Sequence, residues 1–498
     1  MKTTSTAVLG ANIIGCSKKS RKPNLLFIWT DEQRTDTMRI YGNHKIQAPS
    51  LNKLAGQSLA FRYPYVSQPV CTPSRSTVMT GLWPHQNGCV RNNIPLPAEI
   101  PCLPEIINDT DYVNGYFGKW HLGDEVFAQH GFHEWKSIED GYRKYYSEGR
   151  SRDQKSDYWH YLKDLGYQPD TQGNDFSRGF AARLPIEHCK PKFLERQALD
   201  FLQRHHNQPF MLYINFLEPH MPFFGPLDNL HDPADIDLPG NFNDPLEDNE
   251  PLRYRLMRQA YLENGFGQQP LKSEKDWRRL IANYWGLVSQ VDRSVGSILD
   301  KLENLGLAEN TIVVYTSDHG DMMGAHRLLA KTVMYEEAVK VPWLIRLPQF
   351  SVKGGLIDQR VSHIDLVPTL LELMAAREKS DLPGQSLVPL LKGEKIREDH
   401  VFIEWNAPAI KDKDITPQKG YSGAEIKSAA SANIRTVIAP DGWKLCLSDG
   451  DKSQLFNLDE DPLETKNLYD SVRFTDVVQR LTEKIHRWQE LVKDTIQV

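Results

Sequence analysis

The sequence has few cysteines, no long hydrophobic run and no excess of basic charge. Six cysteines among 498 residues are too few to build a small disulfide-bonded scaffold. No apolar stretch reaches the roughly 18 residues that a membrane-spanning helix needs. Lys and Arg number 59 against 65 Asp and Glu, a net charge of −6, whereas general nucleic-acid-binding proteins are usually basic. We find no internal repeat and no low-complexity tract, which excludes repeat and fibrous proteins.

What remains is the composition of an ordinary globular protein, with 40% hydrophobic and 25% charged residues. Short runs that are apolar throughout occur at residues 24–30, 210–217, 310–317 and 342–347. Such runs, without alternation, are typical of strands buried on both faces of a sheet. Apolar residues spaced by three and four predict helices at residues 277–305 and 368–374. The pattern predicts an α/β fold, a large mixed, mainly parallel sheet sandwiched by helices.

The pattern changes after about residue 395. Short strand candidates, separated by turn residues, occur at residues 401–405, 434–438, 443–447 and 454–457. A final helix at residues 475–493 has its apolar residues on one face. We therefore expect an α/β domain at residues 23–390 and a smaller C-terminal subdomain of antiparallel sheet plus helix at 391–498. Residues 125–275 are interpreted as loops and insertions at one end of the large sheet.

Residues 1–22 are interpreted as a leader that precedes the folded domain. Lys2 is followed by a short apolar stretch, and residues 13–16 read Ile-Ile-Gly-Cys. This looks like a bacterial lipobox, the signal at which Cys16 is lipidated and becomes the new N-terminus. We expect an exported protein of the bacterial periplasm or cell surface, whose contact with the membrane is a lipid anchor at Cys16. The alternative is an unprocessed tail.

Polar residues able to bind a metal ion or transfer protons follow three of the predicted strands. Asp31-Glu32 and Asp318-His319 each come directly after an apolar run, and His220 lies just beyond a third. Because ligands of open α/β sheets bind beyond the carboxyl ends of the strands, we expect the two pairs to meet there. Three carboxylates and an imidazole suit a hard divalent cation, Ca²⁺ or Mg²⁺. The alternative is that the two aspartates only cap helices.

Residues 71–75 read Cys-Thr-Pro-Ser-Arg, a combination that is rare by chance. Thr72 can cap a helix and Pro73 suits its first position, so Cys71 is expected just before a helix N-terminus. That end of a helix stabilises negative charge, and Arg75 adds a cationic fork suited to a tetrahedral oxyanion. The alternative is a buried structural cysteine.

With these residues, the sequence resembles the type I sulfatases of the alkaline-phosphatase superfamily, over nearly the whole chain and in the family's order. Residues 71–75 match the signature in which the cysteine becomes formylglycine. Further matches are residues 80–85, 118–123, 218–223 and 317–321, Lys331, and the C-terminal stretch 455–468. The chain departs from the pattern at Glu32, where many members have Asp, and at His319, where some have Asn. Both residues still offer a ligand atom.

The resemblance implies a sulfuric ester hydrolase that depends on formylglycine, which a maturation enzyme makes from Cys71, and on one Ca²⁺, with Mg²⁺ as the alternative. The implied metal ligands are Asp31, Glu32, residue 71, Asp318 and His319. The implied catalytic residues are Cys71, Arg75, Lys119, His121, His220 and Lys331. His85 is expected to contact the substrate only.

The resemblance also implies how these residues act. A hydroxyl of the hydrated aldehyde attacks the sulfur, while Arg75, Lys119 and Lys331 neutralise the sulfate oxygens. His220, with help from Lys331, protonates the leaving alcohol. His121 then deprotonates the second hydroxyl, and sulfate is expelled.

The expected substrate is a sulfated carbohydrate, an oligosaccharide of a sulfated polysaccharide, because export and a long insertion suit that task. Two alternatives stay open: a phosphonate or phosphate ester hydrolase of the same superfamily, and a non-catalytic sulfoglycan-binding protein whose Cys71 is never converted. Aromatic side chains of the insertion could stack on sugars or form ordinary small cores, namely Trp135, Tyr142, Tyr145, Tyr146, Tyr158 and Trp159. Four cysteines could form disulfides or stay free thiols, namely Cys89, Cys102, Cys189 and Cys446.

Overall fold

A computed structural model describes residues 22–267, 269–347, 355–376, 381–396, 399–408, 411 and 420–498. The lipobox-like segment with Cys16 lies outside these residues. Within the described ranges, no helix combines the length and the apolar character needed to cross a membrane.

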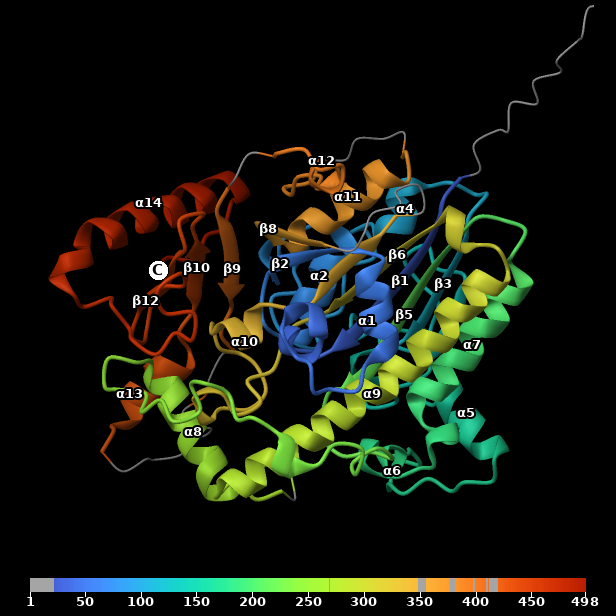
Figure 1. Ribbon diagram of the computed structural model, residues 1–498, viewed down its shortest axis with the longest axis horizontal. Helices are drawn as coiled ribbons and strands as arrows, with labels where there is room; N and C mark the ends of the chain where they lie inside the picture. Colours follow the sequence, from blue (N-terminus) through green and yellow to red (C-terminus); the bar gives the residue numbers. More distant parts are fainter. Residues whose placement is uncertain are drawn as a thin grey trace, which may run out of the picture.

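An eight-stranded sheet forms the centre of the larger part of the molecule (Figure 1). Its strands are β1 Asn24–Asp31, β2 Leu59–Tyr65, β3 Val113–Gly118, β4 Glu134–Ser137, β5 Phe210–Pro219, β6 Thr311–Ser317, β7 Trp343–Arg346 and β8 Gly355–Ser362. Their order is β4-β3-β5-β1-β6-β7-β2-β8. Neighbours pair in parallel except at β7, which is antiparallel to both β6 and β2. The predicted mixed, mainly parallel sheet is confirmed.

Helices cover both faces of this sheet. One face carries α1 Pro49–Gly56, α7 Lys190–Arg204 and α9 Glu274–Asn304, and the other carries α2 Cys71–Thr80, α4 Leu103–Ile107 and α11 Leu366–Leu373. Every residue of β1 and of β6 is buried, as the continuous apolar runs indicate. Helices thus cover both faces of the sheet, and the ends of its strands are the places where polar side chains can form a site.

The interpretation of residues 125–275 as loops is wrong in part. Besides β4 and β5, this segment forms α5 Asp157–Asp164, α6 Arg178–Ala182, α7 and α8 Leu252–Asn264. The apolar side chains of α7 recur at helical spacing and are buried against the sheet: Phe193, Leu194, Ala198, Phe201 and Leu202. The signal for this helix was therefore present in the sequence.

The predicted C-terminal architecture is confirmed. Strands β9 Val401–Trp405, β10 Ile434–Ile438, β11 Trp443–Ser448 and β12 Gln454–Asn457 form an antiparallel sheet, and α14 Thr475–Val492 packs on it (Figure 1). The remaining helices are α3 Pro84–Asn87, α10 Glu336–Val339, α12 Val388–Leu391 and α13 Gly423–Ala430. Lys444 of β11 is fully buried between Glu336 and Glu464, 3.1 and 2.8 Å away. This triad ties the small sheet to the larger part.

Candidate active site

The carboxyl ends of four neighbouring strands meet at one edge of the large sheet. Asp31 ends β1, Asp318 follows β6, His220 follows β5, and Lys119 follows β3. At the end of β3, a Cβ on Gly118 would lie 1.9 Å from the carbonyl oxygen of Asn215, and its φ is +125°. Only glycine fits this close approach, which brings Lys119 to the strand ends.

Five residues predicted as metal ligands lie together there. Single ligand atoms of Asp31, Cys71, Asp318 and His319 all lie within 4.8 Å of one another, and Glu32 forms a second such group with Asp31 and His220. His319 Nε2 is 3.4 Å from Cys71 Sγ. His319 Nδ1 donates to the carbonyl oxygen of Gly320, so Nε2 is left unprotonated in the neutral ring, as a metal ligand requires.

The charges of this cluster fit a divalent cation. Glu32 Oε2 is buried and has no hydrogen-bond partner among the described residues, and a buried carboxylate oxygen normally has one. Burial and the charge of Asp31 raise the pKa of Asp318. Burial alone would also raise the pKa of Asp31, but Lys119 and other nearby cations hold it well below its usual range. Converging buried carboxylates with an imidazole are the donor set that Ca²⁺ or Mg²⁺ could use.

Arg75 forms hydrogen bonds with two of the carboxylates. Its Nε donates to Asp318 at 2.9 Å, its Nη2 to Asp31 at 2.8 Å, and its Nη1 to Asn215 Oδ1 and the Lys119 carbonyl oxygen. The side chain is fully buried. The role of Arg75 toward sulfate oxygens stays a prediction, and the structure shows that Arg75 also holds two of the carboxylates in place.

Cys71 is the first residue of α2, and Val70 occupies the cap position. The helix thus begins earlier than expected, and Thr72 does not cap it: the Thr72 hydroxyl donates to the carbonyl oxygen of His121 at 2.8 Å. Burial, followed by the charge of Asp31, raises the pKa of the Cys71 thiol to about 12. An unmodified Cys71 is therefore a protonated, weak nucleophile at neutral pH.

Two histidines and two lysines complete the surroundings of residue 71. Lys119 Nζ lies 2.5 Å from Asp31, and Lys331 pairs with Glu32 Oε1. His220 Nε2 lies 3.2 Å from the same Glu32 oxygen. Burial lowers the pKa of Lys331 to about 8, although the charge of Asp31 opposes the shift. Lys331 can therefore give up a proton near neutral pH.

His121 is held as a neutral base. Its Nε2 lies 3.0 Å from Asn93 Oδ1, whereas its buried Nδ1 has no partner in the part of the chain that is described. Burial, followed by the charges of Lys119 and Arg75, holds the pKa of His121 well below its usual range. Its φ is +58°, a strained conformation of the kind that clusters at functional sites.

His85 lies apart from these residues. Its Nδ1 contacts Glu404 of the small sheet at 2.6 Å, and its Nε2 contacts the Val492 carbonyl oxygen at 3.0 Å. It follows the far end of α2, about 15 Å along the helix from Cys71. In the structure His85 joins the C-terminal sheet and helix to the larger part, and its contact with substrate stays a prediction.

Several cysteines and aromatic residues of the sequence analysis turn out to be structural. Four of these cysteines are buried free thiols, namely Cys89, Cys102, Cys189 and Cys446. Trp135, Tyr146 and Tyr158 are buried, so they belong to ordinary cores. Tyr142 differs, because its ring stacks on His121 with 4.1 Å between centroids.

Sequence reasoning missed Asn215, Asn93, Arg178 and Glu139, and it named Tyr142 only as one of several aromatic residues that could contact a sugar. Asn215 had a signal, since it is the one polar residue within the apolar run of β5. The others lie in segments without a motif, so only the folded chain brings them to the strand ends.

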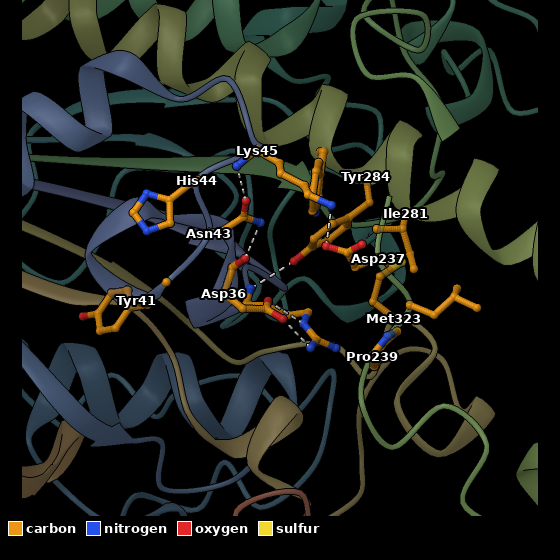
Figure 2. A pocket seen from close by; sticks show the side chains of 14 residues that line it. Asp36, Tyr41, Asn43, His44, Lys45, Asp237, Pro239, Ile281, Tyr284 and Met323 are labelled. Atoms are coloured by element: carbon orange, nitrogen blue, oxygen red, sulfur yellow. Dashed lines mark hydrogen bonds and ion pairs between the residues drawn. The ribbon is translucent and has the colours of Figure 1, made fainter. Parts of the chain in front are cut away.

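Residues that follow β1, among them Arg34, Asp36 and Tyr41, line a pocket of about 450 Å³. Figure 2 shows the side chains around it. None of the residues predicted for the site lines it. Its Tyr284 hydroxyl donates to the Glu32 carbonyl oxygen at 2.6 Å and accepts from the Arg34 backbone N–H at 3.0 Å. Arg34 Nη1 also donates to the carbonyl oxygen of Met322. Tyr284, a residue of the pocket wall, thus fixes the backbone of Glu32 and Arg34 by hydrogen bonds.

A model of the sulfatase family matches residues 23–376, and a model described as N-sulphoglucosamine sulphohydrolase, C-terminal, matches residues 324–491. The uncharacterized sulfatase YidJ of Escherichia coli is 28% identical over 493 residues, 95% of this chain and 88% of that protein. The N-acetylglucosamine-6-O-sulfatase of Bacteroides thetaiotaomicron is 24% identical, over 96% of this chain and 88% of that one. A solved phosphonate monoester hydrolase from Silicibacter pomeroyi has a TM-score of 0.77 and 21% identity, covering 95% and 96% of the two chains. At that identity the likeness concerns the fold alone.

Proposed function

This chain belongs to the sulfatase family and is a sulfuric ester hydrolase, and on that premise we propose that it removes sulfate from a sulfated carbohydrate. The observation that carries the proposal is the convergence of Asp31, Cys71, Asp318 and His319 at the strand ends. The relatives named for sulfated sugars, an N-acetylglucosamine-6-O-sulfatase and a hexuronate-2-O-sulfatase, support the substrate class. Oligosaccharides of a sulfated polysaccharide are the substrates we favour.

In this proposal, Asp31, Glu32, residue 71, Asp318 and His319 hold one Ca²⁺, or Mg²⁺, and Cys71 is converted to formylglycine. A bound divalent ion supplies positive charge that stabilises negative oxygens. The hydrated aldehyde supplies a hydroxyl nucleophile and a route for sulfate to leave, which a thiol lacks. Lys119 and Lys331 carry the positive charge that faces the sulfate oxygens, and Arg75 keeps two of the carboxylates in place.

Proton transfer falls to three side chains. His220 and Lys331 both touch Glu32 Oε1, and together they form the donor to the leaving alcohol. His121 acts as the base, because its neutral ring keeps Nδ1 unprotonated. Lys331 has a proton to give near neutral pH, and His121 has a lone pair to offer. Burial holds the pKa of His220 well below its usual range, and the proton of its neutral ring lies on Nδ1, so Nε2 has to take up a second proton before it can donate.

A panel of esters tests the substrate class. Matured, calcium-loaded protein is expected to hydrolyse sulfated mono- and oligosaccharides faster than phosphonate monoesters or phosphate diesters, because relatives that match nearly the whole chain are named for sulfate esters of sugars. Sulfate release and product chromatography measure the rates. Efficient turnover of a phosphonate with no sugar sulfate accepted would favour the phosphonate hydrolase, and binding without turnover would favour the sulfoglycan-binding protein.

His220→Ala should cost about 10²–10⁴-fold on a sugar sulfate and far less on 4-nitrophenyl sulfate. A sugar alkoxide is a poor leaving group that needs a proton, whereas nitrophenolate leaves unaided. Steady-state kinetics on both substrates measure the difference, with His133→Ala, an exposed histidine, as the control. Equal losses on both substrates would remove His220 from the role of proton donor.

We also propose that the protein is exported and lipid-anchored at Cys16. This proposal rests on the lipobox-like residues 13–16 alone.

A further inference from the structure

Two side chains beside the cluster, Arg178 and Tyr142, belong to no motif of the sequence. Arg178 begins α6, and Tyr142 follows β4, so both come from the segment 125–275. Tyr142 stacks on His121, and Arg178 Nη1 lies 3.5 Å from His220 Nδ1. The pair therefore borders on both histidines of the proposed mechanism.

The contact between Arg178 and His220 is not a hydrogen bond. His220 Nδ1 lies 2.8 Å from the Met221 carbonyl oxygen, which can only accept, so Nδ1 carries a proton. Arg178 Nη1 has only protons to offer, and no other described residue accepts them. The Tyr142 hydroxyl accepts from Arg178 Nη2 at 2.8 Å, and its own proton also has no acceptor within the described ranges. Two free donors thus lie side by side.

Ion pairs with the buried Glu139 fix the position of the Arg178 guanidinium. Glu139 accepts from Arg178 Nε at 2.7 Å and from Arg178 Nη2, and it also pairs with Lys190 of α7. The Glu139 side chain is 4% exposed, whereas that of Arg178 is 30% exposed. Glu218 is a second buried carboxyl group near Lys190 and Arg178, and burial raises its pKa to about 7. Glu139 therefore holds the Nε edge of the guanidinium, while the protons of Nη1 stay available for a ligand.

We propose that Arg178 and Tyr142 bind a second anionic group of the sugar, a uronate carboxylate or a further sulfate, beside the ester that is cleaved. The inference rests on the proposed function and narrows its substrate to sugars with at least two negative charges. Two oxygens of an oxyanion can accept from the free Nη1 protons of Arg178 and from the Tyr142 hydroxyl together. A neutral sugar hydroxyl would form weaker hydrogen bonds with the guanidinium than an oxyanion does.

Matched sugars test the inference. The substrates are the doubly charged sugar sulfate that the wild-type protein cleaves fastest and the same sugar with its uronate reduced or its second sulfate removed. Arg178→Ala should lower kcat/KM on the doubly charged sugar by about 10- to 100-fold, mainly through KM, and by much less on the counterpart that lacks that anion. The counterpart on which wild type and Arg178→Ala have similar kcat/KM values identifies the anion that Arg178 binds, a carboxylate or a sulfate.

Arg183→Ala is the matched control, because Arg183 follows the same helix but its guanidinium lies over the Phe224 ring, and it should change neither rate. If Arg178→Ala fails to fold, Tyr142→Phe replaces it, because it keeps the stack on His121 and removes only the hydroxyl. It should lower kcat/KM on the doubly charged sugar, relative to kcat/KM on the counterpart, by a few-fold. Equal losses on both sugars, or a fastest substrate with a single charge, would overturn the inference alone. Failure of the wild-type protein on every sulfated sugar would overturn the proposed function as well.

Discussion

Cys71→Ala is expected to reduce turnover of every sulfate ester by at least ~10⁴-fold, the scale on which removing a covalent nucleophile acts. The loss should leave the fold intact, since alanine fills most of the volume of this buried side chain and prolongs the same helix. Mass spectrometry of the wild-type peptide that contains residue 71 should show the mass change from a thiol to an aldehyde. Sulfate release and thermal unfolding measure the effects on activity and fold.

Cys89→Ala is the control for this experiment. Cys89 is also a buried free thiol, but it lies in the core between the sheet and α2. Its replacement should cost stability of about 1 kcal/mol and leave activity in place. An unmodified thiol at residue 71 in fully active protein would refute the formylglycine mechanism.

Asp318→Asn should abolish binding of the metal and, with it, lower activity by at least ~10³-fold. The substitution keeps the shape and a partner for Arg75 Nε, but it takes one negative charge out of the proposed ligand set. Asp318→Ala should do the same and also lower stability, by about 3–5 kcal/mol, because Arg75 would keep a buried charge with one partner fewer. Elemental analysis after dialysis, activity and thermal unfolding measure the three effects.

Asp365→Asn serves as the control, because Asp365 is buried as well but accepts only from the backbone N–H groups of Ser362 and Gln385. It should keep the metal and the activity. Full metal occupancy in both Asp318 variants would refute the assignment of Asp318 as a ligand.

The strands and the residues at their ends were predictable because both signals are local. A continuous apolar run indicates a buried strand, and an acidic pair directly after it indicates a strand-end site, as at Asp31 and Asp318. The α7 helix was missed although its apolar spacing was visible, because it lies within a stretch dominated by polar residues and prolines.

The role of Arg75 could not be predicted from its motif. Its partners Asp31, Asp318 and Asn215 lie 44, 243 and 140 residues away in the sequence. A five-residue signature gives the residue type but not which donors are already taken. For the same reason the pairing of Arg178 with Glu139, 39 residues apart, could not be predicted from the sequence.

The burial of α2 limits when the proposed conversion of Cys71 can take place. All ten residues of the helix are buried, and Cys71 is 2% exposed. A separate enzyme cannot grasp the peptide around residue 71 once the sheet and its helices have closed over it. The proposed oxidation therefore has to happen on the unfolded chain, in competition with folding. Each molecule that folds first is trapped as a well-folded thiol, so the active fraction reports the ratio of two rates rather than the stability of the protein.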